Sequence, residues 1–170
     1  MVWIILEQQV KLERWQQLMV QELIVLELLV VSVQVQGGRG PAERHLLVPW
    51  GEKPVAARPA TSPWPGQVPA PAPATVFERP TEAWVVGAEG APVGVTGRGV
   101  VTGDLTRFRP AVGAEWMPVA SWAGPWPVDD HWWDEAAARR IARFQVVGVD
   151  GSAWLMVVEN GRWHTEARYD

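Results

Sequence analysis

The sequence predicts an α+β protein that is mainly β, with an N-terminal helix, a Pro-rich extended linker and a C-terminal antiparallel β-meander that carries one short helix. Three observations predict this class. Apolar residues recur at helical spacing near the N-terminus, prolines cluster mid-chain, and the tail alternates apolar and polar residues around Asp-Gly and Asn-Gly dipeptides. The length of 170 residues suits one domain, or one small domain with an extension.

The first predicted element is a helix over Leu6–Val30. Apolar residues recur there at steps of three and four, and the second half is apolar almost all round. Such a helix needs burial on more than one side, either on the sheet of this chain or on an upstream region or partner. Glu22 and Glu27 interrupt the apolar run Leu18–Val35, and a carboxylate at bilayer depth costs about 2.5–3.5 kcal/mol. We therefore expect no membrane span and a cytoplasmic protein.

A strand and a connector follow. Val31–Gln36 alternates apolar and polar residues, which predicts a half-buried strand, and His45–Trp50 is a second short candidate. Residues 37–75 are rich in glycine and proline, and proline cannot donate to a sheet, so a semi-rigid connector is expected. The expected organisation is residues 1–36 as helix plus strand, the connector 37–75, and a Trp-rich β domain over 76–170.

The Trp-rich domain is predicted to be built of short strands. Upstream candidates are Ala83–Val86, Pro92–Thr96, Gly99–Thr102 and Trp116–Trp122. A short helix is predicted over Asp134–Arg140, because acidic residues open it and arginines close it. The tail predicts a three-stranded meander whose turns are Asp150-Gly151 and Asn160-Gly161, the strongest short hairpin signals. Its strands are Ile141–Val149, Ala153–Glu159 and Arg162–Arg168.

The composition argues against several classes of function. Cysteine is absent, which excludes a thiolate metal site and a Cys nucleophile. The net charge of -4 leaves no strongly basic footprint for nucleic acid on the chain as a whole. The serines lack a nucleophile elbow, and the three histidines are not at metal-ligand spacing. We therefore expect no enzyme activity, no cofactor and no metal site.

Twelve tryptophans against one tyrosine are the main anomaly of the composition. Trp is enriched at protein interfaces, although each Trp could instead fill a thin β core. The candidate partner-binding residues are Trp122, Trp126, Trp132 and Trp133. Pro125 and Pro127 predict that their segment is a rigid, extended connector, whose tryptophans could instead hold it onto the meander. An alternative function is single-stranded nucleic-acid binding by a β module, using exposed Trp with Arg139, Arg140 and Arg143.

The segment Trp122–Trp133 also carries a family resemblance. Trp-Ala-Gly-Pro-Trp-Pro-Val-Asp, followed by Trp-Trp-Asp, resembles the C-terminal region of actinobacterial ImuB-type proteins, which are Y-family DNA-polymerase-like. Other blocks agree in order, so the resemblance covers residues 35–170, and the polymerase core is absent from this chain. These blocks are Gln36–Arg44, Leu47–Glu52, Trp64–Gly66, Pro69–Ala74, Arg139–Val146 and Gly161–Asp170.

The resemblance implies a DNA-repair role in translesion synthesis and damage-induced mutagenesis. In that family the protein is an adaptor without working catalytic acids. The implied partners are a RecA-like accessory protein and an error-prone C-family polymerase. The clamp-binding pattern of the family, Gln-Leu-x-Leu-Trp/Phe, is poorly matched by Gln17–Val20, so binding to the sliding clamp is not expected of this chain. Because the polymerase core is absent, we expect a fragment or a split gene.

Overall fold

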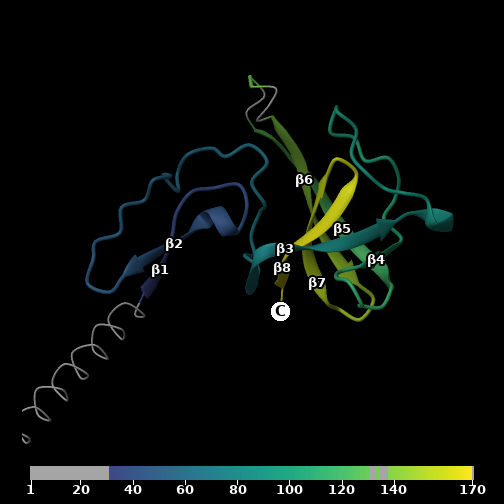
Figure 1. The fold of residues 1–170 in the computed structure, drawn as a ribbon, viewed down its shortest axis with the longest axis horizontal. Coiled ribbons are helices and arrows are strands. Elements are labelled where there is room, and N and C mark those ends of the chain that lie inside the picture. The colour runs from purple at the N-terminus through teal and green to yellow at the C-terminus, as the bar shows by residue number, and fades with distance from the viewer. Residues whose placement is uncertain (1–30, 131–132, 135–137, 170) are drawn as a thin grey trace, which may run out of the picture. The chain divides into compact units, whose positions relative to one another are not determined.

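A computed structural model describes residues 31–130, 133–134 and 138–169, and Figure 1 shows its strands. The helix expected over Leu6–Val30 lies outside these residues. The described chain is mainly β and forms two compact units, each treated separately below. The smaller unit includes residues 31–36 and 45–57, and the larger includes residues 37–44 and 58–169, so the expected connector is shared between them. No helix in the described ranges is long and apolar enough to span a membrane.

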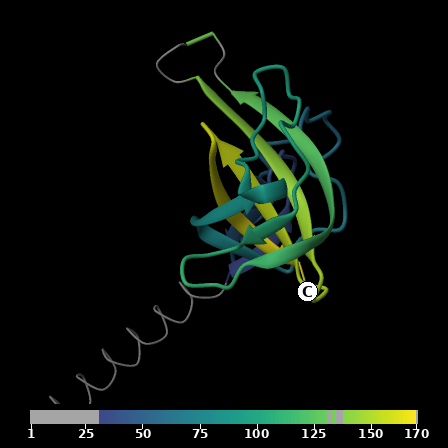
Figure 2. The same cartoon turned by 90° about the vertical axis from the view of Figure 1, so that its right-hand side faces the viewer.

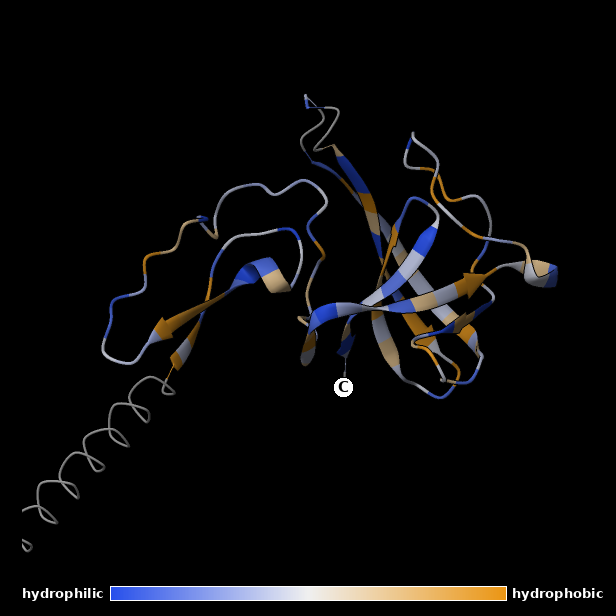
Figure 3. Ribbon diagram, viewed as in Figure 1, coloured by the Kyte–Doolittle hydropathy of each residue, from blue (hydrophilic) through white to orange (hydrophobic). Residues whose placement is uncertain are grey.

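The smaller unit contains the two strands expected from residue alternation. β1 (Val31–Val35) pairs antiparallel with β2 (His45–Pro49), and Val33 lies opposite Leu47. Valines of β1 and Leu47 of β2 are exposed, and Figure 3 shows the apolar residues of this pair in orange. Both strands are therefore confirmed, whereas the half-burial expected for Val31–Gln36 is wrong, because the valines of β1 are exposed.

The larger unit is a closed barrel in which each strand pairs antiparallel with the next along the chain. Its last strand, β8, pairs with its first, β3, and this pairing closes the barrel. Figure 2 shows β5 and β6 as a long pair that projects beyond the other strands. The strands are β3 (Thr75–Val86), β4 (Arg107–Arg109), β5 (Met117–Asp130), β6 (Arg139–Gly148), β7 (Ala153–Glu159) and β8 (Arg162–Tyr169).

The C-terminal meander of β6, β7 and β8 confirms the prediction from the two turn dipeptides. Asn160 and Gly161 have φ of 50° and 75°, the positive values that a two-residue type I′ hairpin requires. At the other turn, Gly151 has φ of 84°, and its N–H donates to the Gly148 carbonyl at 3.0 Å. Asn160-Gly161 is therefore the expected two-residue turn, whereas at Asp150-Gly151 only Gly151 has a positive φ and the turn is longer, because the Gly148 N–H donates to the Ser152 carbonyl at 2.8 Å.

The strands upstream of the meander differ from the prediction. Pro92–Thr96 and Gly99–Thr102 form only isolated bridges, because the chain there leaves β3 through a short 3-10 helix, η2 (Ala88–Gly90), and a loop. The sequence prediction missed β4, whose three residues carry too short a pattern to stand out. Ala83–Val86 is the end of a longer strand, β3, and the strand expected over Trp116–Trp122 is the start of the longer β5, which begins at Met117.

Two further predictions are corrected near the end of β5. The segment expected to be a connector is itself part of β5, where Trp122 lies opposite Val146 and Pro127 opposite Ala142. A register shift between Ala123 and Trp126 accommodates the proline-rich stretch. The helix expected over Asp134–Arg140 is wrong at its described positions, because Asp134 and Ala138 are not helical and β6 begins at Arg139. At Arg139 and Arg140, pairing with β5 overrides the helix expected from local propensity.

The barrel interior is filled with apolar side chains. Phe108, Phe144 and Met156 have no solvent exposure. The Phe144 ring lies 5.9 Å from that of Trp122 and 5.1 Å from that of Trp163, centre to centre. The indole N–H of Trp163 is buried and donates to the Val93 carbonyl at 2.8 Å. The interior is thus a packed core in which several tryptophans have a structural role.

Part of the expected connector covers the outer face of β5, β6 and β7. Val68 of this cover is buried with Leu155 and Ala167, and its N–H donates to the Arg39 carbonyl at 3.1 Å. Gly66 packs so closely that a Cβ there would lie 2.1 Å from the Pro127 carbonyl oxygen. The cover consists of residues 37–44, which include the 3-10 helix η1 (Ala42–Arg44), and residues 58–74. The barrel therefore has an apolar layer outside its wall as well as a core within it.

Candidate functional site

The candidate partner-binding tryptophans do not form one surface in the described chain. Trp122 packs against the barrel core beside Phe144, and Trp126 packs against the cluster beneath the cover that contains Val68. Both indoles are half-buried, so they hold β5 in the barrel. Trp133 is 70% exposed in the segment between β5 and β6, and Trp132 lies outside the described residues. Of the four candidates, Trp133 is thus the described one that offers an exposed ring.

Arg139, the first candidate for nucleic-acid binding, is held by a carboxylate on the neighbouring strand. Its Nε and Nη2 donate to the two carboxylate oxygens of Glu159 at 2.7 and 2.9 Å. These hydrogen bonds lower the pKa of Glu159 and raise the pKa of Arg139, because each favours the charged form. The guanidinium is therefore engaged within the protein.

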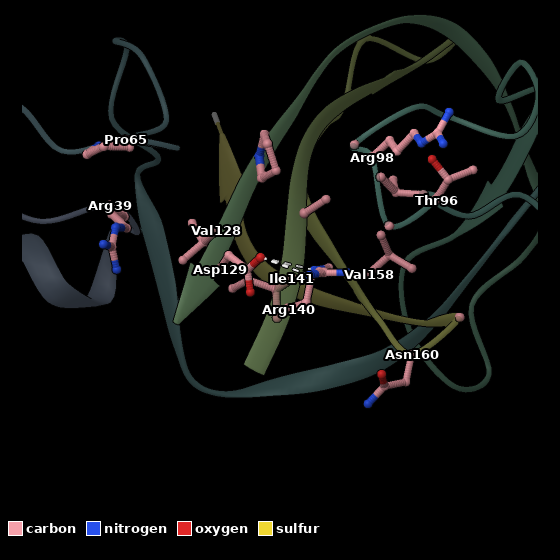
Figure 4. Close-up of a pocket in the computed structure, with 16 residues that line it drawn as sticks. Arg39, Pro65, Thr96, Arg98, Val128, Asp129, Arg140, Ile141, Val158 and Asn160 are labelled. Carbon is pink, nitrogen blue, oxygen red and sulfur yellow. Dashed lines mark hydrogen bonds and ion pairs between the residues drawn. The ribbon is translucent and has the colours of Figure 1, made fainter. Parts of the chain in front are cut away.

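Arg140 lines a pocket of about 650 Å³ at one end of the barrel. Its Nη2 donates to Oδ2 of Asp129, its partner across β5 and β6, at 2.9 Å, and Figure 4 shows this pair in the pocket wall. Arg98 and Arg39 also line the pocket, and Arg39 forms an ion pair with Asp130. The charge of Arg140 is thus already paired with a carboxylate in the pocket wall.

Arg143 is buried beneath the cover with Glu166. Its Nε and Nη2 donate to the Glu166 carboxylate at 2.6 and 3.2 Å, and the two side chains are only 7% and 15% exposed. The cover lies directly on the guanidinium, because a Cβ on Gly40 would be 2.7 Å from Nη2. A buried charge requires a partner of opposite sign, and here the pair is structural.

The three candidate arginines therefore differ in position but share one feature. Each makes two hydrogen bonds to a carboxylate from a neighbouring or nearby strand. A phosphate would have to compete with that carboxylate for the same guanidinium. This arrangement does not favour nucleic-acid binding at Arg139, Arg140 and Arg143.

A different cluster, which the sequence analysis did not find, lies on the outer face of β3 and β4. Trp84 lies directly opposite Arg109 in the sheet, and the Arg109 guanidinium carbon is 3.9 Å from the centre of the Trp84 ring. The same carbon is 5.5 Å from the ring of Trp116, and that of Arg107 is 5.7 Å from Trp116. We call these four residues the Trp–Arg ladder. Its signal in the sequence is Arg107-Phe108-Arg109, in which a buried Phe separates two outward arginines.

Other kinds of site find little support in the described ranges. No group of three or more His, Asp or Glu side chains there is placed to hold a metal ion. Comparison with protein-family models, with curated proteins and with solved structures finds no match to this chain. Three features therefore bear on function: the exposed ring of Trp133, the Trp–Arg ladder and the resemblance carried by the sequence.

Proposed function

We propose that this chain is a non-catalytic protein-interaction module, an adaptor of a cytoplasmic complex for translesion synthesis and damage-induced mutagenesis. The resemblance of residues 35–170 to the C-terminal region of ImuB-type proteins motivates the proposal. The structural observation that supports it best is the exposed indole of Trp133, beyond the end of the long strand β5.

An exposed Trp at this place is suited to protein binding. Trp is enriched among residues that dominate interface energies, because its ring buries a large apolar area and its N–H can still be satisfied. Figure 2 shows that the β5–β6 pair projects beyond the other strands, and Trp133 follows the end of β5 at Asp130 in the sequence. The proposed partners are the RecA-like accessory protein and the error-prone C-family polymerase of the complex.

The alternative of nucleic-acid binding through Arg139, Arg140 and Arg143 is the weaker explanation of this part of the molecule. Those cations already have carboxylate partners at hydrogen-bonding distance. The indole of Trp133, by contrast, is 70% exposed. The adaptor proposal is therefore preferred for the β5–β6 end of the barrel.

The test is calorimetric titration of the full chain against each purified partner. Trp133→Ala should weaken binding at least about 30-fold, because interface hot spots cost 2 kcal/mol or more on truncation. Trp50→Ala is the matched control, since Trp50 is 75% exposed but belongs to the smaller unit. It should leave the affinity within about twofold. Absence of binding to both partners, or equal losses in the two variants, would overturn the proposal.

A further inference from the structure

We propose that the Trp–Arg ladder on the outer face of β3 and β4 is a binding site for single-stranded nucleic acid. This site goes beyond the adaptor function and uses none of the residues that support that function. Its location also differs from that of Arg139, Arg140 and Arg143. The inference rests on four properties: a rigid base, one exposed ring, cations without carboxylate partners, and the match of both groups to a nucleotide.

The ladder has a rigid base because the residues between its members form the barrel core. Successive residues of a strand point to opposite faces. Ala83 and Val85 on β3 and Phe108 on β4 point inward and are buried, so Trp84, Arg107 and Arg109 must point outward. The positions of these side chains are thus set by the barrel wall rather than by a loop.

The ladder alternates rings and guanidinium groups. Arg109 lies between Trp84 and Trp116, at 3.9 and 5.5 Å from their ring centres, and Arg107 follows on Trp116. Trp116 is 39% exposed and Arg107 is exposed, so this end of the ladder faces solvent. A planar group from solvent can therefore reach this end of the ladder, where it would stack against the Arg107 guanidinium or take its place on the Trp116 ring.

The cations of the ladder have no carboxylate partner in the described ranges. The ion pairs found there join other arginines to Asp or Glu, and none includes Arg107 or Arg109. Stacking on an indole uses the face of a guanidinium, whereas its N–H donors point out from the edge. The exposed edge of Arg107 is therefore available for an anion, and phosphate accepts two such hydrogen bonds at once.

A single-stranded nucleic acid complements both parts of the ladder. Each nucleotide supplies a phosphate for a guanidinium and a base whose face can stack on an indole. An acidic peptide supplies anions, but it has no planar ring at every residue. Arg162, exposed at the start of β8 beside β3, adds positive charge to this side of the barrel, whereas Glu82 and Glu115 reduce it. We therefore expect binding that is strongest at low salt.

The test is fluorescence anisotropy with the full chain and a labelled oligothymidylate of about 12 nucleotides, within the usual site size of such proteins. Binding should weaken with salt, with a log–log slope of about −1.4 to −2.1 for two or three phosphate contacts. Trp116→Ala should weaken binding roughly 5- to 100-fold, the range found when one stacked base loses its aromatic partner. A duplex of matched length should bind more weakly, because its bases are already stacked.

Arg168→Gln is the matched control. Arg168 also lies against a tryptophan, at 5.4 Å from the ring of Trp154, but on β8 at the opposite end of β3, where it pairs with Thr75. This variant should bind the oligonucleotide within about twofold of the wild type. Near-ultraviolet circular dichroism checks that each variant is folded, and NMR shifts of the Trp116 indole N–H report contact in the wild type itself.

Three results would overturn the proposal. The first is no oligonucleotide binding at low salt. The second is equal binding of single strand and duplex with no shift of the Trp116 indole, which would indicate charge alone. The third is preferential binding of an acidic peptide such as polyglutamate, which would assign the ladder to a protein ligand. Because Trp133 is not involved, each of these results leaves the adaptor proposal to its own test.

Discussion

Two outer faces of the barrel use arginine in opposite ways. On β5, β6 and β7, arginines meet carboxylates, and part of this face lies under the cover formed by residues 37–44 and 58–74. On β3 and β4, Arg107 and Arg109 meet tryptophans. The same residue type is therefore a structural partner on one face and a candidate binding group on the other, and its neighbours decide which.

Solvent access explains the difference. Arg143 lies beneath the cover, where an unpaired charge would lose its hydration without compensation, so Glu166 is required beside it. Arg107 is exposed to water and needs no carboxylate. Its contact with Trp116 orders the side chain and leaves its charge available.

The largest expected effect comes from breaking the buried pair. Arg143→Met should lower the free energy of unfolding by about 3 kcal/mol, because Glu166 is left charged without its partner. Urea denaturation measures this loss. The double variant Arg143→Met with Glu166→Leu should recover most of it, since an apolar pair can replace a buried ion pair. A loss below about 0.5 kcal/mol, as expected of an ordinary surface substitution, would contradict the assignment of this pair as structural.

The next effect tests whether the cover is packed onto β5. Gly66→Ala should cost about 1–3 kcal/mol beyond its backbone strain, because the new Cβ would meet the Pro127 carbonyl. Gly151→Ala is the matched control, since Gly151 has a similar φ of 84° but no atom within 4 Å of the added Cβ. The difference in stability between the two variants, measured by thermal unfolding, gives the cost of the close contact at residue 66 without the backbone strain. Equal losses in the two variants would show that the cover does not lie on β5.

On the uncovered face the expected effects on stability are smaller. Trp116→Ala should lower the free energy of unfolding by about 0.5–1 kcal/mol, the usual value of an exposed cation–π contact. Urea denaturation again provides the measurement. A loss above about 3 kcal/mol, typical of truncating a buried aromatic, would mean that the ladder is part of the core and would remove the contrast between the two faces.

The smallest effect concerns the exposed pair of Arg139 and Glu159. The folded-state pKa of Glu159 is lowered by the hydrogen bond from Arg139, whereas an unfolded glutamate titrates at about 4.3. The pair therefore stabilises the fold fully above that pH, and the stabilisation is lost as the pH falls through the lower folded-state pKa. Glu159→Gln should cost about 0.2–1 kcal/mol near neutral pH and nothing in strong acid. If Glu159→Gln costs the same free energy of unfolding in strong acid as near neutral pH, the ion pair does not stabilise the fold as described.

Local signals in the sequence predicted the elements whose geometry is local. The meander follows from Asn160-Gly161 and Asp150-Gly151, because these dipeptides favour the positive φ of their turns. The alternation of Val31–Val35 likewise predicted β1. These elements needed no knowledge of distant partners.

Features that depend on distant partners could not be read from the sequence. Closure of the barrel requires β8 to meet β3, which is far away along the chain. Ala138, Arg139 and Arg140 favour a helix locally, but β5 pairs with the two arginines and makes them a strand. The cover was expected to be a linker because proline weakens sheets, and only the barrel wall beneath it provides its apolar partners.

The candidate site shows the same limit. Composition identified tryptophan and arginine as the residue types to examine, and the exposure of Trp133 agrees with its selection. It could not say which arginines are paired, because Glu159 and Glu166 lie on other strands. The ladder was missed because Trp84, Arg109 and Trp116 become neighbours only through the pairing of β3 with β4 and the return of the chain toward β5.

The contrast between the two faces is tested most directly by two double variants that remove the same charge. Arg107→Gln with Arg109→Gln and Arg139→Gln with Arg140→Gln each remove two positive charges, so overall electrostatics change equally. Binding of the labelled oligothymidylate at low salt is measured for both. The account predicts at least a tenfold loss for the β4 pair and less than a threefold loss for the β6 pair. Equal losses, or a larger loss for the β6 pair, would contradict it.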